Sequence, residues 1–187
     1  QEAHRCAIVE SKTKQTEEKI MARKRPTAED LIDRAEINDV LMDYAIGIDS
    51  RDWARYRAIF PDEVELDFSS WSGNPAAPMA AEDWVAGVRN TLSGFDGTQH
   101  MLMNSVIELD GDRANVTLYM NAHHYLNIEG AHNMHSIGGY YTHRMIRTAN
   151  GWLSEACKLT VSWESGDRAL FAIAADRWAA QSDAAGS

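Results

Sequence analysis

Two residues whose side chains suit proton transfer stand far apart in the sequence, the carboxylate of Asp49 and the imidazole of His100. Asp49 ends the stretch D-Y-A-I-G-I-D, and the phenol of Tyr44 lies five positions before it. A carboxylate beside an imidazole fixes the tautomer of the ring and increases its basicity, which makes the ring a general base suited to neutral pH. If the fold brings these two side chains together, they form such a base.

Each of these residues also has an ordinary structural interpretation. An Asp that follows a helix is very commonly the N-cap of the next helix, and Tyr44 fits the apolar stripe of its own helix. Positions 44 and 49 lie about 140° apart around a regular helix, so they share a face only if the helix ends near Ile48. Gly47 is expected to mark that break. The sequence leaves both interpretations of Asp49 open.

The predicted strand around His100 reads T-Q-H-M-L-M-N-S. With a period of two residues, the imidazole shares a face with Leu102, Asn104 and Val106. A histidine on a mostly apolar strand face is more often a core or edge residue than a catalyst, unless a carboxylate lies beside it.

The other histidines give little indication of a metal site. His123 and His124 are adjacent in a predicted strand and therefore point to opposite faces, so they cannot both bind one ion. His132 and His135 could chelate from a loop, but neither a Cys pair nor H-E-x-x-H accompanies them. Cys157 has no assigned partner and no G-x-S-x-G is present, so no nucleophilic mechanism is indicated. We expect neither a metal nor a cofactor.

The elements that must position these groups begin with a bent pair of helices. Thr27-Ala-Glu-Asp30 resembles a capping box and opens a helix with one apolar stripe over residues 31–48. A second, shorter helix is predicted over residues 53–60, before Pro61. Apolar spacing predicts a third helix over residues 84–95.

The rest of the pattern is that of strands and tight turns. Residues 63–68 alternate charged and hydrophobic side chains, which predicts a strand covered on one face, and residues 69–79 have the Gly and Pro content of a loop. Asp110-Gly111 and Asn150-Gly151 are strong hairpin signals. They separate further predicted strands at 98–109, 113–128, 135–148 and 152–163.

Gly138-Gly139 lies within the third of these strands and is expected to mark a bulge or bend. Residues 167–180 have mixed helical character. Helices that come first and strands that follow predict an α+β fold, in which helices cover one side of a strongly curved sheet.

Composition limits the classes of function. The 187 residues carry a formal net charge of −10, which opposes broad binding to nucleic acid or to an anionic membrane. Cys6 and Cys157 give no disulfide framework, which favours a reduced, cytoplasmic setting. No run of about 18 apolar residues is present. We expect an N-terminal extension at 1–26, flexible or partly helical, a single domain at 27–180 and a tail at 181–187.

The succession of these motifs resembles the SnoaL-like branch of the nuclear transport factor two-like superfamily. The resemblance covers residues 28 to 165 and rests on Y-A-I-G-I-D, E-V-E-L-D-F, T-Q-H-M-L-M-N, L-D-G-D-R-A, I-G-G-Y-Y-T and G-W-L. It implies a cone-shaped α+β barrel. About three helices would pack over a curved, mixed but mostly antiparallel sheet, with a deep apolar pocket between them.

Scytalone dehydratase, bile acid 7α-dehydratase and hexachlorocyclohexane dehydrochlorinase belong to this branch and abstract protons with an Asp–His pair. Asp49 and His100 occupy the corresponding places, after the first helix and at the start of the strand that follows the third helix. Tyr44 resembles a Tyr of the bile acid enzyme, whereas the dehydrochlorinase has Lys there. Lys158 is the nearest match to a late-strand Arg, although a strand Lys is usually exposed.

The same resemblance implies which residues line the pocket. One of the two adjacent histidines, His123 or His124, lies near the position of the second His of scytalone dehydratase. The expected substrate-binding residues are Trp53, Phe68, Leu102, Asn121, His123, His124 and Tyr140.

The implied activity is that of a cofactor-free lyase of the dehydratase type, or of an isomerase. His100 would remove a proton from carbon, and Tyr44 would donate to a carbonyl oxygen or a departing hydroxyl. The eight Met and six Trp residues suit a small, flat or polycyclic apolar substrate. Polyketide cyclisation and a non-catalytic ligand-binding or oligomerisation module remain alternatives. The dyad enzymes are trimers and related proteins are dimers, which implies a homo-oligomer.

Overall fold

The structure is a computed structural model that describes residues 25–129 and 133–185. Contacts between residues divide the chain into two units, Gln1–Ile32 and Asp33–Ser187. In the first unit, the Thr27 amide donates to Asp30 Oδ2 at 2.7 Å and the Asp30 amide donates to Thr27 Oγ1 at 3.1 Å. This confirms the predicted capping box. Up to residue 24, the predicted N-terminal extension lies outside the described residues.

Five helices and six strands make up the described residues, and no helix among them is both long and apolar enough to cross a bilayer. In chain order the elements are α2 (Ala28–Asp49), α3 (Trp53–Ala58), β1 (Glu63–Asp67), α4 (Ser69–Ser72), β2 (Ala77–Ala80), α5 (Ala81–Leu92), β3 (Gly97–Asp110), β4 (Arg113–Tyr125), β5 (Met134–Thr148), β6 (Gly151–Gly166) and α6 (Leu170–Ala185).

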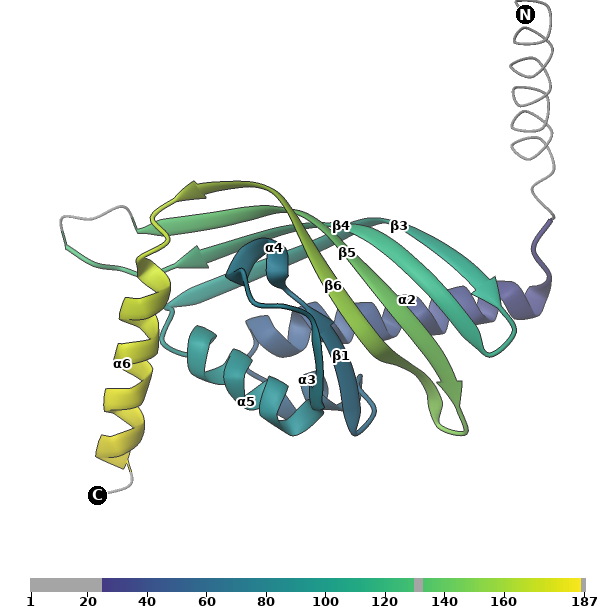
Figure 1. The fold of residues 1–187 in the computed structure, drawn as a ribbon, viewed down its shortest axis with the longest axis horizontal. Helices are drawn as coiled ribbons and strands as arrows, with labels where there is room; N and C mark the ends of the chain where they lie inside the picture. The colour runs from purple at the N-terminus through teal and green to yellow at the C-terminus, as the bar shows by residue number, and fades with distance from the viewer. Residues whose placement is uncertain (1–24, 130–132, 186–187) are drawn as a thin grey trace, which may run out of the picture. The chain divides into compact units, whose positions relative to one another are not determined.

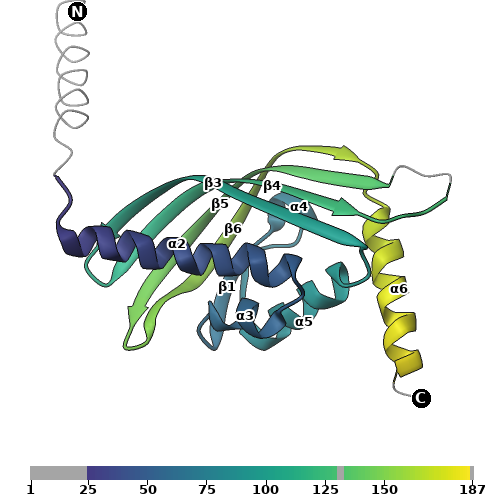
Figure 2. The ribbon, with the colours of Figure 1, turned by 180° about the vertical axis from the view of Figure 1, so that it is seen from behind.

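The six strands form one mixed sheet in the order β2-β1-β6-β5-β4-β3. β1 pairs with β6 in parallel, and the other pairs are antiparallel. The sheet is strongly curved, with α3 and α5 on its concave side (Figure 1). Figure 2 shows that the part of α2 within the second unit lies on the same side. The predicted α+β class is confirmed, and β2 and β3 are left as the two edges of an open sheet.

Both predicted hairpin turns are present. Gly111 and Gly151 have positive φ angles of 60° and 107°, a backbone region that glycine enters without steric cost. The predicted bulge is also confirmed, because the register of β5 against β6 shifts between Gly138 and Gly139. A Cβ at Gly138 would lie 2.0 Å from the Trp163 ring, so that only glycine fits under this indole.

The core lies between the concave face of the sheet and the helices. Alternate residues of β4 are buried, from Ala114 to His124, and they face buried side chains of α2 such as Leu41 and Tyr44. Gly47 was predicted to mark the end of the first helix, but it lies within α2, which continues to Asp49. A Cβ at Gly47 would lie 2.8 Å from the Tyr56 amide nitrogen, so this glycine instead lets α3 pack against α2.

Three other predictions about elements need correction. The predicted loop at 69–79 contains α4 and leads into β2, a short edge strand in which all four residues are exposed. The last helix runs on to Ala185, beyond its predicted end at residue 180. In β3, a bulge between Met103 and Val106 reverses the alternation, so that Val106 is exposed and Ile107 is buried.

The same bulge changes the face that His100 was predicted to share. Asn104 adopts a left-handed conformation with φ 56° within it. Asn104 and Val106 therefore leave the inward face on which the imidazole lies.

Candidate active site

Asp49 and His100 meet where α2 ends and β3 begins. His100 Nδ1 lies 2.7 Å from Asp49 Oδ1, and the His100 backbone amide donates to Asp49 Oδ2 at the same distance. A carboxylate can only accept, so Nδ1 carries the proton of the neutral ring and Nε2 keeps its lone pair. The His100 side chain is 5% exposed and lines a cavity. The geometry is that of a general base held by its carboxylate.

The Asp49 carboxylate is stabilised in its charged form. Burial raises its pKa, but hydrogen bonds and charge from His100, with a hydrogen bond from Thr98, bring the pKa below its ordinary value. Thr98 Oγ1 donates to Asp49 Oδ1 at 2.9 Å. The interpretation of Asp49 as a helix cap is wrong, because Asp52 accepts the Arg55 amide at 3.0 Å and caps α3.

The cavity next to His100 has a volume of about 430 Å³ and is lined by residues of the sheet, of α2 to α5 and, through Phe171, of α6. Aromatic and aliphatic side chains form most of its wall, and Asp83 is the one formally charged residue among the described residues that line it. The residues that line the cavity include Tyr44, Ile48, Tyr56, Leu66, Phe68, Trp71, Trp84, Met120, Ala122, His124, Ile137, Tyr141, Leu159 and Phe171. Such a wall suits an uncharged, largely apolar ligand.

Three buried tyrosines, Tyr44, Tyr56 and Tyr141, form a phenol cluster in this wall. The Tyr44 ring centroid lies 5.2 Å from that of Tyr56 and 5.3 Å from that of Tyr141. Trp84 Nε1 donates to the Tyr56 hydroxyl at 2.8 Å. Burial raises the pKa of all three phenols, so that they remain neutral donors.

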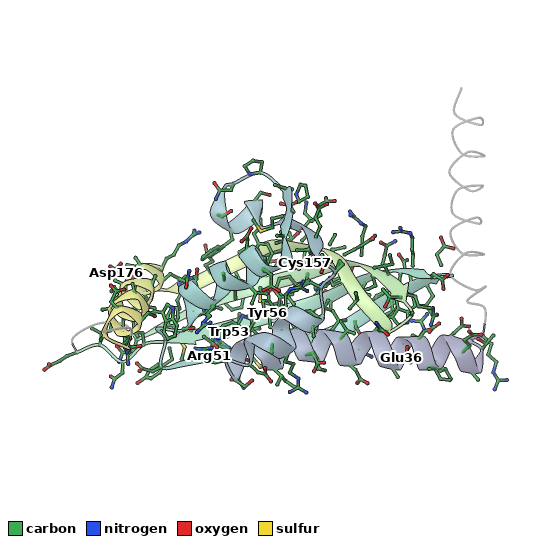
Figure 3. All side chains as sticks on the ribbon, turned by 90° about the horizontal axis from the view of Figure 1, so that it is seen from below. Glu36, Arg51, Trp53, Tyr56, Cys157 and Asp176 are labelled. Atoms are coloured by element: carbon green, nitrogen blue, oxygen red, sulfur yellow. The ribbon has the colours of Figure 1, made fainter. Side chains whose placement is uncertain are left out.

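A polar chain lies behind the phenol cluster. Cys157 Sγ is 3.8 Å from His143 Nε2, and His143 Nδ1 is 2.9 Å from Ser154 Oγ. Burial raises the pKa of the Cys157 thiol and lowers the pKa of His143 to about 4, which keeps both groups neutral. Figure 3 shows Tyr56 and Cys157 in the interior, whereas Glu36 and Asp176 lie on outer helices.

His124 is the member of the adjacent pair that faces the cavity. Its ring centroid lies 5.6 Å from that of His100, at an interplanar angle of 88°. Burial, together with the nearby His100, lowers the pKa of His124 to about 3. Its Nδ1 is buried without a hydrogen-bond partner, so this neutral ring has an unused polar atom beside the base.

His123, Asn121 and Tyr140 do not line the cavity. His123 lies on the opposite side of β4 from His124 and contacts Ser136 Oγ through Nδ1 at 2.8 Å. Asn121 shares that side because it is two residues away. In β5 the buried, inward residue is Tyr141, so its neighbour Tyr140 faces outward.

Of the remaining predicted residues, Phe68 lines the cavity, whereas Leu102, Trp53 and Lys158 do not. Leu102 packs against the core, and Trp53 packs against Tyr56 with ring centroids 6.5 Å apart. The structure does not bring Lys158 to the dyad, because its side chain is 55% exposed and pairs with Asp67 at 2.7 Å. This ion pair lowers the pKa of Asp67 to about 2. Lys158 follows the buried Cys157 and therefore points to the other side of β6.

Sequence reasoning missed Tyr56, Trp84, Tyr141 and Phe171. The first two belong to the apolar stripes of predicted helices, where an inward aromatic has the same pattern whether it lines a cavity or fills a core. Phe171 comes from the last helix, whose packing the pattern did not reveal. No group of three or more His, Cys, Asp or Glu side chains within 25–129 and 133–185 could hold a metal, and His132 lies outside this range.

Comparison with known proteins identifies the architecture. A family model described as a SnoaL-like domain matches residues 29–158. Uncharacterized proteins of Mycobacterium tuberculosis and Mycobacterium bovis are 27% identical over 95 residues, which make up 51% of this chain and 63% of each relative. The match therefore spans less than two thirds of the length of these relatives.

Solved structures with the same fold include the Kfla4162 protein of Kribbella flavida, which is 29% identical with a TM-score of 0.71 over 76% of this chain and 97% of its own. A type 2 hexachlorocyclohexane dehydrochlorinase is 24% identical, with a TM-score of 0.62 over 73% and 90%. A Novosphingobium aromaticivorans protein, provisionally described as a scytalone dehydratase, is 19% identical, with a TM-score of 0.65 over 74% and 89%. Because their identities are below 25%, the last two structures show a shared fold and nothing about activity.

Proposed function

Because the chain belongs to the SnoaL-like domain family, we propose that it is a cofactor-free lyase of the dehydratase type or an isomerase. Its substrate would be a small, uncharged, flat carbonyl compound. The observation that carries the proposal is the 2.7 Å contact between Asp49 and His100, with the imidazole on the wall of an apolar cavity.

The reaction begins at the dyad. His100 Nε2 removes a proton from a carbon next to the carbonyl group, and Asp49 stabilises the imidazolium that forms. The electron pair of the broken C–H bond moves into the carbon skeleton, and negative charge develops on the carbonyl oxygen. A base in this position contributes about 10²–10⁴-fold to the rate.

The phenol cluster is suited to receive that oxygen. Tyr44 donates a hydrogen bond or its proton to the oxygen, and the raised pKa of the phenol keeps the donor protonated at neutral pH. In an isomerase, the imidazolium returns the proton to another carbon. In a lyase, a hydroxyl at the β-carbon leaves with that proton as water.

The wall of the cavity favours an uncharged substrate. No lysine or arginine belongs to the described residues that line it, so nothing there compensates a carboxylate or phosphate removed from water. The rings of Phe68 and Trp84, with centroids 4.8 Å apart and planes tilted by 50°, offer aromatic faces to a ring system.

The test is exchange of α-protons of 2-tetralone, a flat neutral ketone, followed by NMR in D₂O. Wild type should exchange faster than buffer, and His100→Ala and Asp49→Asn should each lose about 10²–10⁴-fold. His123→Ala is the matched control. This imidazole is adjacent in sequence to His124, which faces the cavity, but it lies on the outer side of β4. Binding of the ketone without exchange above buffer, with His100→Ala equal to wild type, would favour a non-catalytic binding module.

A further inference from the structure

We propose that Arg51 is a positioning residue that holds Asp49 in place for His100 and that it acts through the hydroxyl of Thr98. Its catalytic consequence rests on the proposed function, but its effect on Asp49 does not. Arg51 does not line the cavity, so it has no contact with a bound molecule there.

The contacts of Arg51 join three segments around the dyad. Nη1 donates to the Ile48 carbonyl at 2.7 Å and to Thr98 Oγ1 at 2.8 Å, and Nη2 donates to the Phe95 carbonyl at 3.5 Å. The guanidinium therefore links the end of α2 to the turn that leads into β3. These are the two segments that carry Asp49 and His100.

The guanidinium also fixes the direction of the Thr98 hydrogen bond. Arginine can only donate, so Thr98 Oγ1 accepts from Arg51 and its own proton is free for Asp49 Oδ1 at 2.9 Å. The same Oδ1 atom contacts His100 Nδ1. The chain Arg51–Thr98–Asp49–His100 thus orders one carboxylate oxygen by three successive contacts.

The backbone of Arg51 supports a role beyond a turn. Its φ is 60°, in the left-handed region that is costly for a residue with a Cβ. Asn104, at φ 56°, is the other described non-glycine residue with positive φ, and asparagine tolerates this region. Glycine would fit the turn at 51 without cost, but it has no guanidinium to order Thr98.

Charge gives the arrangement a second effect. Burial lowers the pKa of Arg51, and the Asp49 carboxylate opposes that shift. Arg51 is in turn a cation near the Asp49 carboxylate. It helps to keep Asp49 ionised while the imidazole keeps a free Nε2 toward the cavity.

The test is Arg51→Gly, which removes the guanidinium and relieves the left-handed backbone. Asn104→Gly is the matched control, because it relieves the same conformation in the β3 bulge. We expect Arg51→Gly to raise the pKa of Asp49, followed by the ¹³C shift of its labelled carboxyl group, and Asn104→Gly to leave it unchanged. In 2-tetralone exchange, kcat should fall about 10–100-fold at constant KM, the range typical of groups that orient a functional side chain.

Two further variants keep the proposal decidable. Thr98→Val removes the intermediate hydroxyl and should raise the Asp49 pKa in the same direction, whether or not Arg51→Gly folds. Arg51→Lys keeps the charge but not the planar fork, so it should restore only part of the rate. An Asp49 pKa that is unchanged in both Arg51→Gly and Thr98→Val overturns the proposal. If wild type does not exchange 2-tetralone faster than buffer, the proposed function is overturned, whereas the effect of Arg51 on the Asp49 pKa can still be measured.

Discussion

The dyad and the phenol cluster share one cavity wall, but they control charge by different means. Asp49 keeps a full negative charge because the His100 amide, the His100 ring and the Thr98 hydroxyl all donate to it. The phenols of Tyr44, Tyr56 and Tyr141 are kept neutral by burial. The carboxylate beside His100 is thus kept charged by hydrogen-bond donors, whereas the phenols are protected from ionising.

In the proposed reaction, the charge of Asp49 supports the imidazole that takes a proton from carbon, and the neutral phenols supply a hydrogen bond to oxygen. Each of the following changes tests one part of that difference.

Among the changes outside the dyad, the largest effect is expected at the phenol cluster. Tyr44→Phe should lower kcat for 2-tetralone exchange by about 10²–10³-fold, the loss typical when one donor to a developing oxyanion is removed. Tyr119→Phe is the matched control because this phenol is 56% exposed. A Tyr44→Phe enzyme with wild-type kcat would leave the phenols with a purely structural role.

The second effect concerns acid stability. The pKa of buried His143 is about 4, whereas an unfolded histidine titrates near 6.5. The unfolded chain therefore binds the proton first, so stability is greatest above about pH 6.5 and falls as the pH decreases toward 4. At pH 5 the loss from this ring is about 2 kcal/mol.

Urea unfolding at several pH values measures this loss. His143→Gln should reduce the slope of unfolding free energy against pH between 5 and 6.5 by up to about 1.4 kcal/mol per pH unit. The buried His124 contributes a similar slope of its own, which should remain. An unchanged slope in His143→Gln would mean that the polar chain behind the phenols admits a proton.

The smallest effect is expected at Lys158. Because this side chain pairs with Asp67 away from the cavity, Lys158→Met should leave kcat/KM within about twofold of wild type. The pKa of Asp67 should rise from about 2, since Lys158 is the largest cause of its low value. A large loss of rate would mean that Lys158 acts in the reaction and that Asp49 is not the sole charged residue on which the rate depends.

The fold was predictable where burial leaves a periodic trace. The alternation in 63–68 and the two hairpin signals located β1 and the long strands, because one face of each is covered. The edge strand β2 has no buried residue and contains Pro78, so it has no period to detect and has the composition of a loop. Edge strands tolerate proline because one side of the backbone needs no partner.

The site was predictable only in part. Resemblance pointed to Asp49 and His100, which the structure brings together, but the choice among neighbours depended on strand phase. His124 shares its phase with the apolar Ala122 and Met120, a local signal that could have selected it over His123. Tyr141 likewise shares its phase in β5 with the apolar Ile137 and Met145, so the same signal could have selected it over Tyr140.

Gly94 lies where the turn after α5 approaches the backbone of α6. A Cβ at this position would lie 1.8 Å from the carbonyl oxygen of Ala174 in α6, the helix that also carries Phe171 into the cavity wall. Any side chain at 94 must therefore push α6 outward and take the Phe171 ring with it. A homologue could accept a bulkier molecule by one substitution in a turn, with every reactive group left in place.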